Sequence, residues 1–510
     1  MQSISKVKFL ILIKNIINQF IKGRKISNII KIGAVQRQSI ITLFWQIAFT
    51  AIGFISTMYF AHKVGADILG AYFLFTAYQG IFSMVTDGGF GGAAVKRISE
   101  GYEQNAYFSA YFVIRLVFTV LVIVALLLFR EYFVDINESG MIIWLILLLI
   151  VSLLAGSISS GVVGIGKVGI SATCAAIGNI SRVIIQVVAI YLGYEVVGLV
   201  GGVLVGLLIT AIIEFHFLDL RFVRFRRTHI KSLSVFSFWL FLTSGGVLVF
   251  SQADTIMIGY FMNNADVGIY RVALQFTMVA TFTTYALRGT LFPKVSHWGK
   301  SGEVGLVEES LSRAISYSLI LAVPVFMGGM LLGDRLLYFF YGEDFASGYL
   351  ALVALLAVQV VNVFQYFFTM YLDALDHPKE SFKVTAVGVV SNIVLNIVLI
   401  PVMGIDGAAI ATLATMILNA MLAKNALSRL MTIRVERRSL LNIMTAAVVM
   451  GVLIGVYRLL VPLSNVWITL LAVVLGGMAY VALVLKLDRR IMDELRGIVE
   501  GMGVLWPRWL

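Results

Sequence analysis

The chain has 510 residues, of which 60% are hydrophobic and only 13% are charged, whereas soluble domains carry roughly 25% charged residues. This composition excludes a water-soluble fold. The single cysteine, Cys174, and the five scattered histidines exclude an internal disulfide and a cysteine- or histidine-based zinc site. The net charge of +12 therefore has to be explained within a membrane protein.

Apolar stretches along the chain predict about fourteen membrane-spanning helices, because about 20 apolar residues cross a bilayer as a helix. The first seven predicted spans cover residues 39–61, 69–95, 107–129, 140–163, 170–192, 196–215 and 234–259. The second seven cover residues 267–291, 310–332, 347–371, 382–401, 405–423, 440–460 and 466–485. The fold class that we expect is an all-α polytopic membrane protein of the cell membrane.

The positive charges orient these spans, because cytoplasmic loops collect lysine and arginine. If both termini are cytoplasmic, the inside segments hold 31 of the 39 lysines and arginines, and the outside loops hold only Lys63, Arg130, Arg335 and Arg458. The inside clusters would lie against anionic membrane lipids. The net charge therefore needs no nucleic-acid partner.

An internal repeat predicts two lobes. Gly70, Tyr72 and Lys96 in the second span recur at one constant offset as Gly268, Tyr270 and Lys294 around the eighth, while Asn179 aligns with Asn392 and Gly198 with Gly407. Transporters built from such repeats place a binding site between the lobes near the midplane. Glycines at every fourth position on the sixth span, Gly198, Gly202 and Gly206, predict close packing against a neighbouring helix.

The repeat and the charges divide the chain into segments. We predict a basic cytoplasmic segment (1–38), a first lobe of six spans (39–215), a cytoplasmic linker (216–233), a second lobe of six spans (234–423), a basic cytoplasmic loop (424–439), two additional spans (440–485) and a cytoplasmic tail (486–510). For the first segment we favour an amphipathic helix on the membrane surface over a disordered tail.

Four arginines lie within predicted spans and are candidates for substrate binding: Arg115, Arg182, Arg271 and Arg288. An arginine near the bilayer centre costs roughly 2.5 to 3.5 kcal/mol on insertion scales, so it needs a partner or a watery cavity. Guanidinium groups grip phosphate bidentately, which favours an anionic phosphate or pyrophosphate substrate. Two alternatives remain open. An arginine could form a structural ion pair with Asp87, and Asp87 could also act as a gate. Arg271 and Arg288 could instead extend their side chains to the lipid head groups.

A second group of polar residues lies at one depth in the predicted second lobe. Asp254, Asn396 and Thr412 are about five to seven residues from the outer ends of their spans, and Asn392 is one helical turn from Asn396. One carboxylate with amide and hydroxyl oxygens can hold a small hard cation, or can be protonated if no metal binds. Interhelical hydrogen bonding and exposure of Asp254 at the interface are the alternatives.

Three stretches of this chain resemble a known family. The stretches DTIMIGYF (254–261), VGIY (267–270) and PVMGIDGAAIAT (401–412) are similar to those of the polysaccharide transporter family, the O-antigen-type oligosaccharide flippases. This family shares a superfamily with the MATE drug exporters and the lipid II flippase. The resemblance implies a two-lobed fold of mostly fourteen helices that moves lipid-linked oligosaccharides by alternating access.

The lipid II flippase branch also implies a sodium site. By position it would comprise Asp254, Asn392, Asn396, Ala408 and Thr412. This chain departs from that branch at Asn396, where the branch carries a second acid, so the site has less negative charge.

From the sequence we therefore expect a flippase, not an enzyme, that moves a polyprenyl- or dolichyl-linked oligosaccharide from the inner to the outer leaflet. The only cofactor expected is a coupling ion, sodium or a proton, and no other metal. Protein partners implied by this role are glycan polymerases or glycosyltransferases. The first alternative is a MATE-like exporter of cationic drugs, which would present acids in its cavity. The second is a membrane glycan polymerase or ligase, which would normally carry a sizeable catalytic outer loop. The third is a lipid scaffold without transport activity.

Overall fold

The structure, a computed structural model, describes residues 34–132, 140–488 and 492. Within these residues the secondary structure is helical throughout, with no strand. The first half of the chain contains α2 (Ala34–Asp87), α3 (Phe90–Ser99), α4 (Gln104–Leu128), η1 (Arg130–Tyr132), α6 (Met141–Gly164), α7 (Val168–Tyr191), α8 (Glu195–Phe215) and α9 (Arg227–Phe261).

The second half contains α10 (Asn264–Thr277), η2 (Met278–Thr281), α11 (Phe282–Ser301), α12 (Val304–Tyr341), α13 (Glu343–Ala346), α14 (Tyr349–Ala374), α15 (Pro378–Leu427), α16 (Arg437–Leu460) and α17 (Val466–Leu487). Two of the longest helices each join two predicted spans at one glycine with a positive φ, because only glycine adopts this conformation without steric cost. The glycines are Gly65 in α2 (φ 75°) and Gly404 in α15 (φ 61°).

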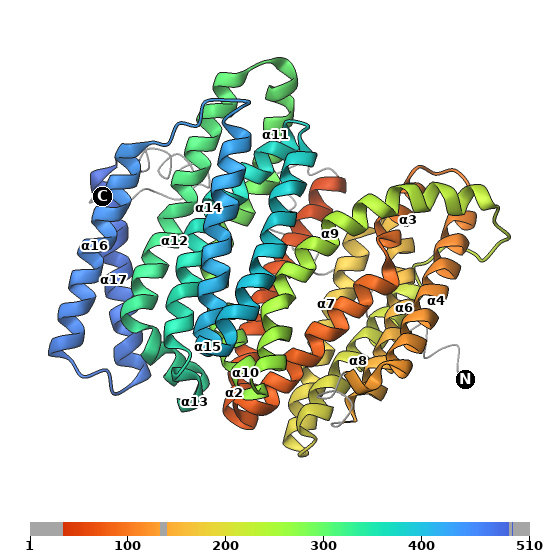
Figure 1. The fold of residues 1–510 in the computed structure, drawn as a ribbon, viewed down its shortest axis with the longest axis horizontal. Helices are drawn as coiled ribbons and strands as arrows, with labels where there is room; N and C mark the ends of the chain where they lie inside the picture. The colour runs from red at the N-terminus through yellow and green to blue at the C-terminus, as the bar shows by residue number, and fades with distance from the viewer. Residues whose placement is uncertain (1–33, 133–139, 489–491, 493–510) are drawn as a thin grey trace, which may run out of the picture.

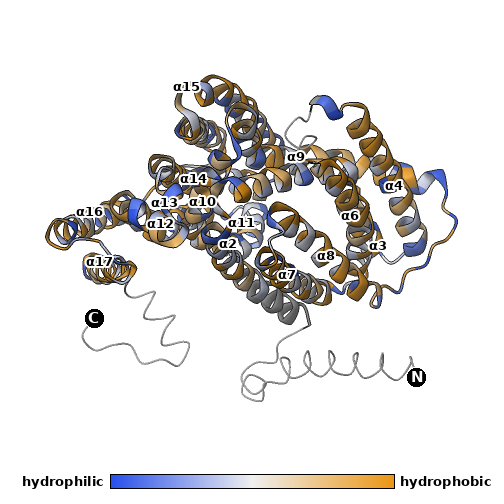
Figure 2. Ribbon diagram, turned by 90° about the horizontal axis from the view of Figure 1, so that it is seen from below, coloured by the Kyte–Doolittle hydropathy of each residue, from blue (hydrophilic) through white to orange (hydrophobic). Residues whose placement is uncertain are grey.

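The chain is a multi-pass membrane protein. Ten described helices are long and apolar enough to cross a bilayer, or eleven if the two halves of α9, which bends by 40° between Leu242 and Gly245, form one span. Most of the ribbon is strongly apolar (Figure 2). Each apolar stretch predicted from the sequence is mostly α-helical, with breaks at Gly88 and Gly89 in the second stretch and at 278–281 in the eighth. This confirms the all-α membrane fold, while the number of crossings and the side on which the termini lie stay predictions.

The helices form two groups (Figure 1). The group of α3, α4, α6, α7 and α8 lies on one side of the molecule, and α12, α14, α15, α16 and α17 lie on the other, with α2, α9 and α10 between them. This arrangement has the form expected of two lobes, although the predicted lobe boundaries themselves stay predictions.

Between the two groups, α2 packs against α10. The helices touch at Gly70 and Gly268, which occupy equivalent positions in the internal sequence repeat. A Cβ built on Gly70 would lie 2.8 Å from the backbone nitrogen of Gly268, and one built on Gly268 would lie 3.1 Å from the backbone nitrogen of Gly70. Neither position has room for a side chain, so the two backbones are in direct contact.

The glycine series on α8 packs as predicted. Added Cβ atoms at Gly198, Gly202 and Gly206 would overlap side chains of Ala189, Gln186 and Arg182 on α7. The three close approaches, one per helical turn, confirm that the series serves packing between α7 and α8.

Two predicted boundaries differ from the helices of the structure, while the cytoplasmic linker (216–233) itself stays a prediction. Helix α9 begins at Arg227, well before the predicted span at 234, because the Arg226 backbone nitrogen donates to His229 Nδ1 (3.0 Å) and caps the helix. The eighth predicted span also differs, since the 3-10 turn η2 interrupts it between α10 and α11. The predicted amphipathic segment (1–38) and the C-terminal tail (486–510) lie mostly outside the described residues.

Candidate functional site

The polar residues predicted to form a cation site converge around Asp254. Its carboxylate accepts hydrogen bonds from Asn396 Nδ2 (2.7 Å), Thr412 Oγ1 (2.7 Å) and Tyr270 Oη (2.5 Å). Asn392 closes the cluster, since its Oδ1 accepts from Asn396 Nδ2 (3.1 Å) and its Nδ2 donates to Thr412 Oγ1 (3.2 Å). The exposure alternative for Asp254 is therefore wrong, because only 8% of this residue is exposed.

Helix α15 brings these groups together because it doubles back at Gly404. The two halves place Asn392 and Asn396 opposite Thr412, and α9 and α10 supply Asp254 and Tyr270. Ala408 is fully buried one turn before Thr412. Tyr270 is the member that sequence reasoning missed. It belongs to the internal repeat and to the VGIY stretch, but nothing in its spacing indicated a contact with Asp254.

The donor set of this cluster fits a small hard cation. Carboxylate, amide and hydroxyl oxygens are the ligands that such ions prefer. Asn396 Oδ1 is buried and has no hydrogen-bond partner, although buried polar atoms in proteins are rarely unsatisfied. Rotation of that amide would present Oδ1 in place of Nδ2 to the carboxylate side, where a cation could take up both oxygens. With that amide rotated, a protonated Asp254 could instead donate its proton to Asn396 Oδ1, without a metal.

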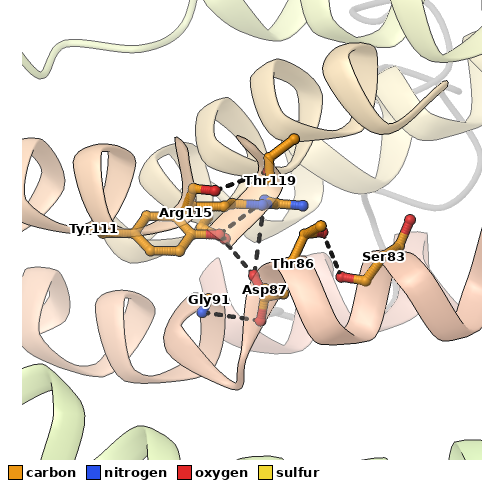
Figure 3. Close-up of polar contacts among 8 residues, drawn as sticks. Ser83, Thr86, Asp87, Gly91, Tyr111, Arg115 and Thr119 are labelled. Atoms are coloured by element: carbon orange, nitrogen blue, oxygen red, sulfur yellow. Dashed lines mark hydrogen bonds and ion pairs between the residues drawn. The ribbon is translucent and has the colours of Figure 1, made fainter. Parts of the chain in front are cut away.

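A second buried polar cluster lies in the first group of helices (Figure 3). Arg115 Nη1 lies 3.8 Å from Asp87 Oδ1 and donates to Tyr111 Oη (2.9 Å), and Tyr111 Oη donates to the same Asp87 oxygen (2.9 Å). Asp87 is held in turn by the backbone nitrogen of Gly91 (3.1 Å). The guanidinium occupies the space that a side chain at Gly156 would need. The alternative of a structural ion pair for Arg115 is thus realised in this conformation.

Neutralising one member of this pair is expected to destabilise the protein, while neutralising both is expected to cost less. Arg115→Gln leaves the Asp87 carboxylate with a hydroxyl and one backbone donor, and a broken buried pair is strongly destabilising. Because the Asp87 side chain is 27% exposed, solvent screening reduces the effect to about 1 kcal/mol. Thermal unfolding of the two single variants and of Asp87→Asn/Arg115→Gln measures the coupling. Additive effects in this cycle would show that the two charges do not interact.

The other three predicted arginines differ in their surroundings. Arg182 and Arg271 are half-buried, each with a buried Nε that lacks a hydrogen-bond partner, and Arg271 stacks over the Phe73 ring at 5.5 Å. Arg288 is exposed and donates to Tyr366 Oη (3.2 Å). Within the described residues, Arg182 and Arg271 form no ion pair.

One hydrogen bond joins α7 to α2 close to Arg182 in the chain. Gln186 Nε2, one turn from Arg182 on α7, donates to Tyr72 Oη (3.3 Å) on α2, and Tyr72 lies within electrostatic range of the Arg271 guanidinium on α10. Asp254 also lies within that range. Arg271 is adjacent in sequence to Tyr270, which donates to Asp254 Oδ2 (2.5 Å).

Comparison with known proteins agrees with this architecture. A family model described as polysaccharide biosynthesis protein matches residues 65–350. The chain is 26% identical over 433 residues to a probable low-salt glycan biosynthesis flippase of Haloferax volcanii, an alignment that covers 85% of this chain and 92% of that protein. It is also 26% identical to the lipid II flippase of Bacillus subtilis over 197 residues, which are 37% of this chain and 36% of that protein.

Solved structures share the fold. The lipid II flippase in an inward closed conformation superposes with a TM-score of 0.77 at 16% identity, covering 89% of this chain and 100% of that chain. An inward-facing multidrug transporter of the MATE family superposes with a TM-score of 0.63 at 16% identity, covering 77% of this chain and 98% of that chain. At such identities the likeness describes the architecture alone.

Proposed function

Because the chain belongs to the family of polysaccharide biosynthesis proteins, we propose that it is a flippase for a lipid-linked oligosaccharide. The substrate would be carried on a polyprenyl or dolichyl phosphate or pyrophosphate, and would move from the inner to the outer leaflet by alternating access. The names of the relatives in Haloferax volcanii and Bacillus subtilis support this assignment. We assign the protein no covalent chemistry.

The observation that carries the proposal is that Arg182 and Arg271 are half-buried arginines that form no ion pair among the described residues. They lie on α7 and α10, which both pack against α2, and we propose that these two charged donors bind the phosphate or pyrophosphate group of the substrate together. A cationic drug would be repelled there, which disfavours the MATE-like exporter although the fold is shared. Arg115 would join them only when its pair with Asp87 opens, so we assign that pair a gating role.

The Asp254 cluster is the proposed coupling site. An ion that binds Asp254, Asn392, Asn396 and Thr412 more tightly in one state than in the other would bias the outward and inward conformations. The position of Arg271 beside this cluster would let the charge of the substrate and the charge of the ion influence one another. Sodium and a proton both satisfy this role.

The test is translocation of a labelled lipid-linked oligosaccharide in proteoliposomes, with sodium and proton gradients imposed in turn. We expect one gradient to accelerate movement, and Asp254→Asn to abolish that acceleration because the amide carries no charge. Ser251→Ala, an exposed position on the same helix, is the matched control. Movement that ignores both gradients would remove the coupling role and leave the flippase. No movement by folded protein with the organism's own glycolipid would overturn the flippase itself.

A further inference from the structure

A buried carboxyl group lies outside both clusters, at the end of α8. Glu214 is completely buried, and it is the one buried glutamate among the described residues. Its Oε1 accepts hydrogen bonds from Ser171 Oγ on α7 (2.6 Å) and Ser159 Oγ on α6 (3.5 Å), and the two hydroxyls lie 3.2 Å apart. Its Oε2 is buried without any hydrogen-bond partner. Three helices of the first group therefore meet on one carboxyl group.

The titratable groups that face this carboxyl supply no positive charge. On α7, the thiol of Cys174 is buried and lies within electrostatic range of Glu214. Lys167, one turn before Ser171, directs its Nζ to the Phe217 carbonyl (2.9 Å) and to Asp219 Oδ2 (2.6 Å). On α6, the residue that contacts Glu214 is Ser159, which carries no charge. In the described part of the chain, no lysine, arginine or histidine forms an ion pair with Glu214.

An ionised carboxylate in such surroundings would be costly. Burial of an unpaired charge is strongly unfavourable even after the surroundings relax, and two hydroxyls do not cancel a full charge. A metal ion would find one acid and two hydroxyls on this face, which is a sparse oxygen set for a cation that takes six or more ligands. A proton needs only the one unpartnered oxygen.

We propose that Glu214, with Ser159 and Ser171, forms a proton-binding site of the first lobe that is separate from the Asp254 cluster. The proton resides on Oε2, while Oε1 keeps its bonds from the two serines. Release of this proton creates a buried anion that must be hydrated, so it requires the ends of α6, α7 and α8 to separate. Because Glu214 directly precedes the linker between the lobes, this separation occurs where the first lobe joins the second. The site does not depend on the nature of the transported substrate.

Infrared spectroscopy of the purified protein in liposomes tests the proposal directly. At neutral pH we expect a carbonyl stretch of protonated carboxyl groups, in which the glutamate component has an amplitude equal to one group per protein molecule. Growth on carbon-13-labelled glutamate should shift this band, which identifies a glutamate without any mutation. Glu214→Gln should remove the band, Ser171→Ala should shift its frequency because a hydrogen bond to the carbonyl oxygen is lost, and Asp254→Asn should leave it in place.

A carboxyl band that does not shift with labelled glutamate would overturn the proposal, and so would a spectrum without any protonated glutamate band. Thermal stabilisation by sodium chloride, compared with potassium chloride at equal ionic strength, adds a second test. If sodium raises the melting temperature of the wild type and Glu214→Gln loses that rise, the site binds a metal cation and the proton assignment is wrong. Unchanged melting in both salts, together with the labelled band, supports the proton site.

Discussion

Alanine in place of Arg182 or Arg271 is expected to lower translocation of the lipid-linked oligosaccharide by about tenfold to a hundredfold. A hydrogen bond to a charged group contributes roughly 1.5 to 3 kcal/mol, and each 1.4 kcal/mol corresponds to a factor of ten in affinity. Neither guanidinium forms an ion pair among the described residues, and Asp254, which lies within electrostatic range of Arg271, keeps its own hydrogen bonds in both variants. The loss should therefore fall on function, with the amount of folded protein unchanged.

The matched control is Arg313→Ala, because this arginine is exposed and its ion pair with Glu309 lies on the surface. Lysine at position 182 or 271 should retain part of the activity, since it keeps the charge and loses the planar fork that grips phosphate with two bonds. Translocation in proteoliposomes and glycan display in a flippase-deficient strain both measure the effect. Wild-type rates in both alanine variants would remove these residues from the substrate site.

Valine in place of Gly70 or Gly268 is expected to prevent correct assembly of the protein. The added side chain would meet backbone atoms of the facing helix, and backbone cannot move aside as a flexible side chain can. Overpacking of this kind costs about 3 kcal/mol, which is a large part of the stability of a protein. We expect a clear loss of monodisperse protein in size-exclusion chromatography and a lower melting temperature for whatever remains.

Gly80→Val on the same helix is the control, because no atom of a neighbouring element lies within 4 Å of a Cβ at this position. The double variant at Gly70 and Gly268 should cost much less than the sum of the single variants, because both act on one contact. If Gly70→Val and Gly80→Val behave alike, the two helices are not held at this crossing.

The helices could be predicted from the sequence because apolar runs of about 20 residues have one stable outcome in a bilayer. The sequence was less informative about where the helices are interrupted and where they begin. The 3-10 turn at 278–281 lies inside a continuous apolar run, and the early start of α9 depends on a cap between Arg226 and His229 that composition does not reveal. Such features depend on local hydrogen bonds, to which hydrophobicity is insensitive.

The candidate site could be predicted in part. Asp254, Asn396 and Thr412 share a depth in the membrane, and residues at one depth on neighbouring helices have a chance to meet. Tyr270 and Glu214 were missed because their importance depends on which helices are neighbours, and a single sequence does not contain that information. For Arg115 and Asp87 the sequence left pairing and substrate binding open, since rotation of two helices about their axes decides between them.

The contact between Gly70 and Gly268 has a consequence for the history of the chain. A contact between equivalent positions is what a two-fold axis produces, because each partner presents the same patch to the other. A shorter ancestral gene that encoded one lobe could have formed a homodimer through this same glycine. Duplication and fusion of that gene would then have preserved the interface, and afterwards each half could acquire its own chemistry, a carboxylate with amides in one and a carboxyl with serines in the other.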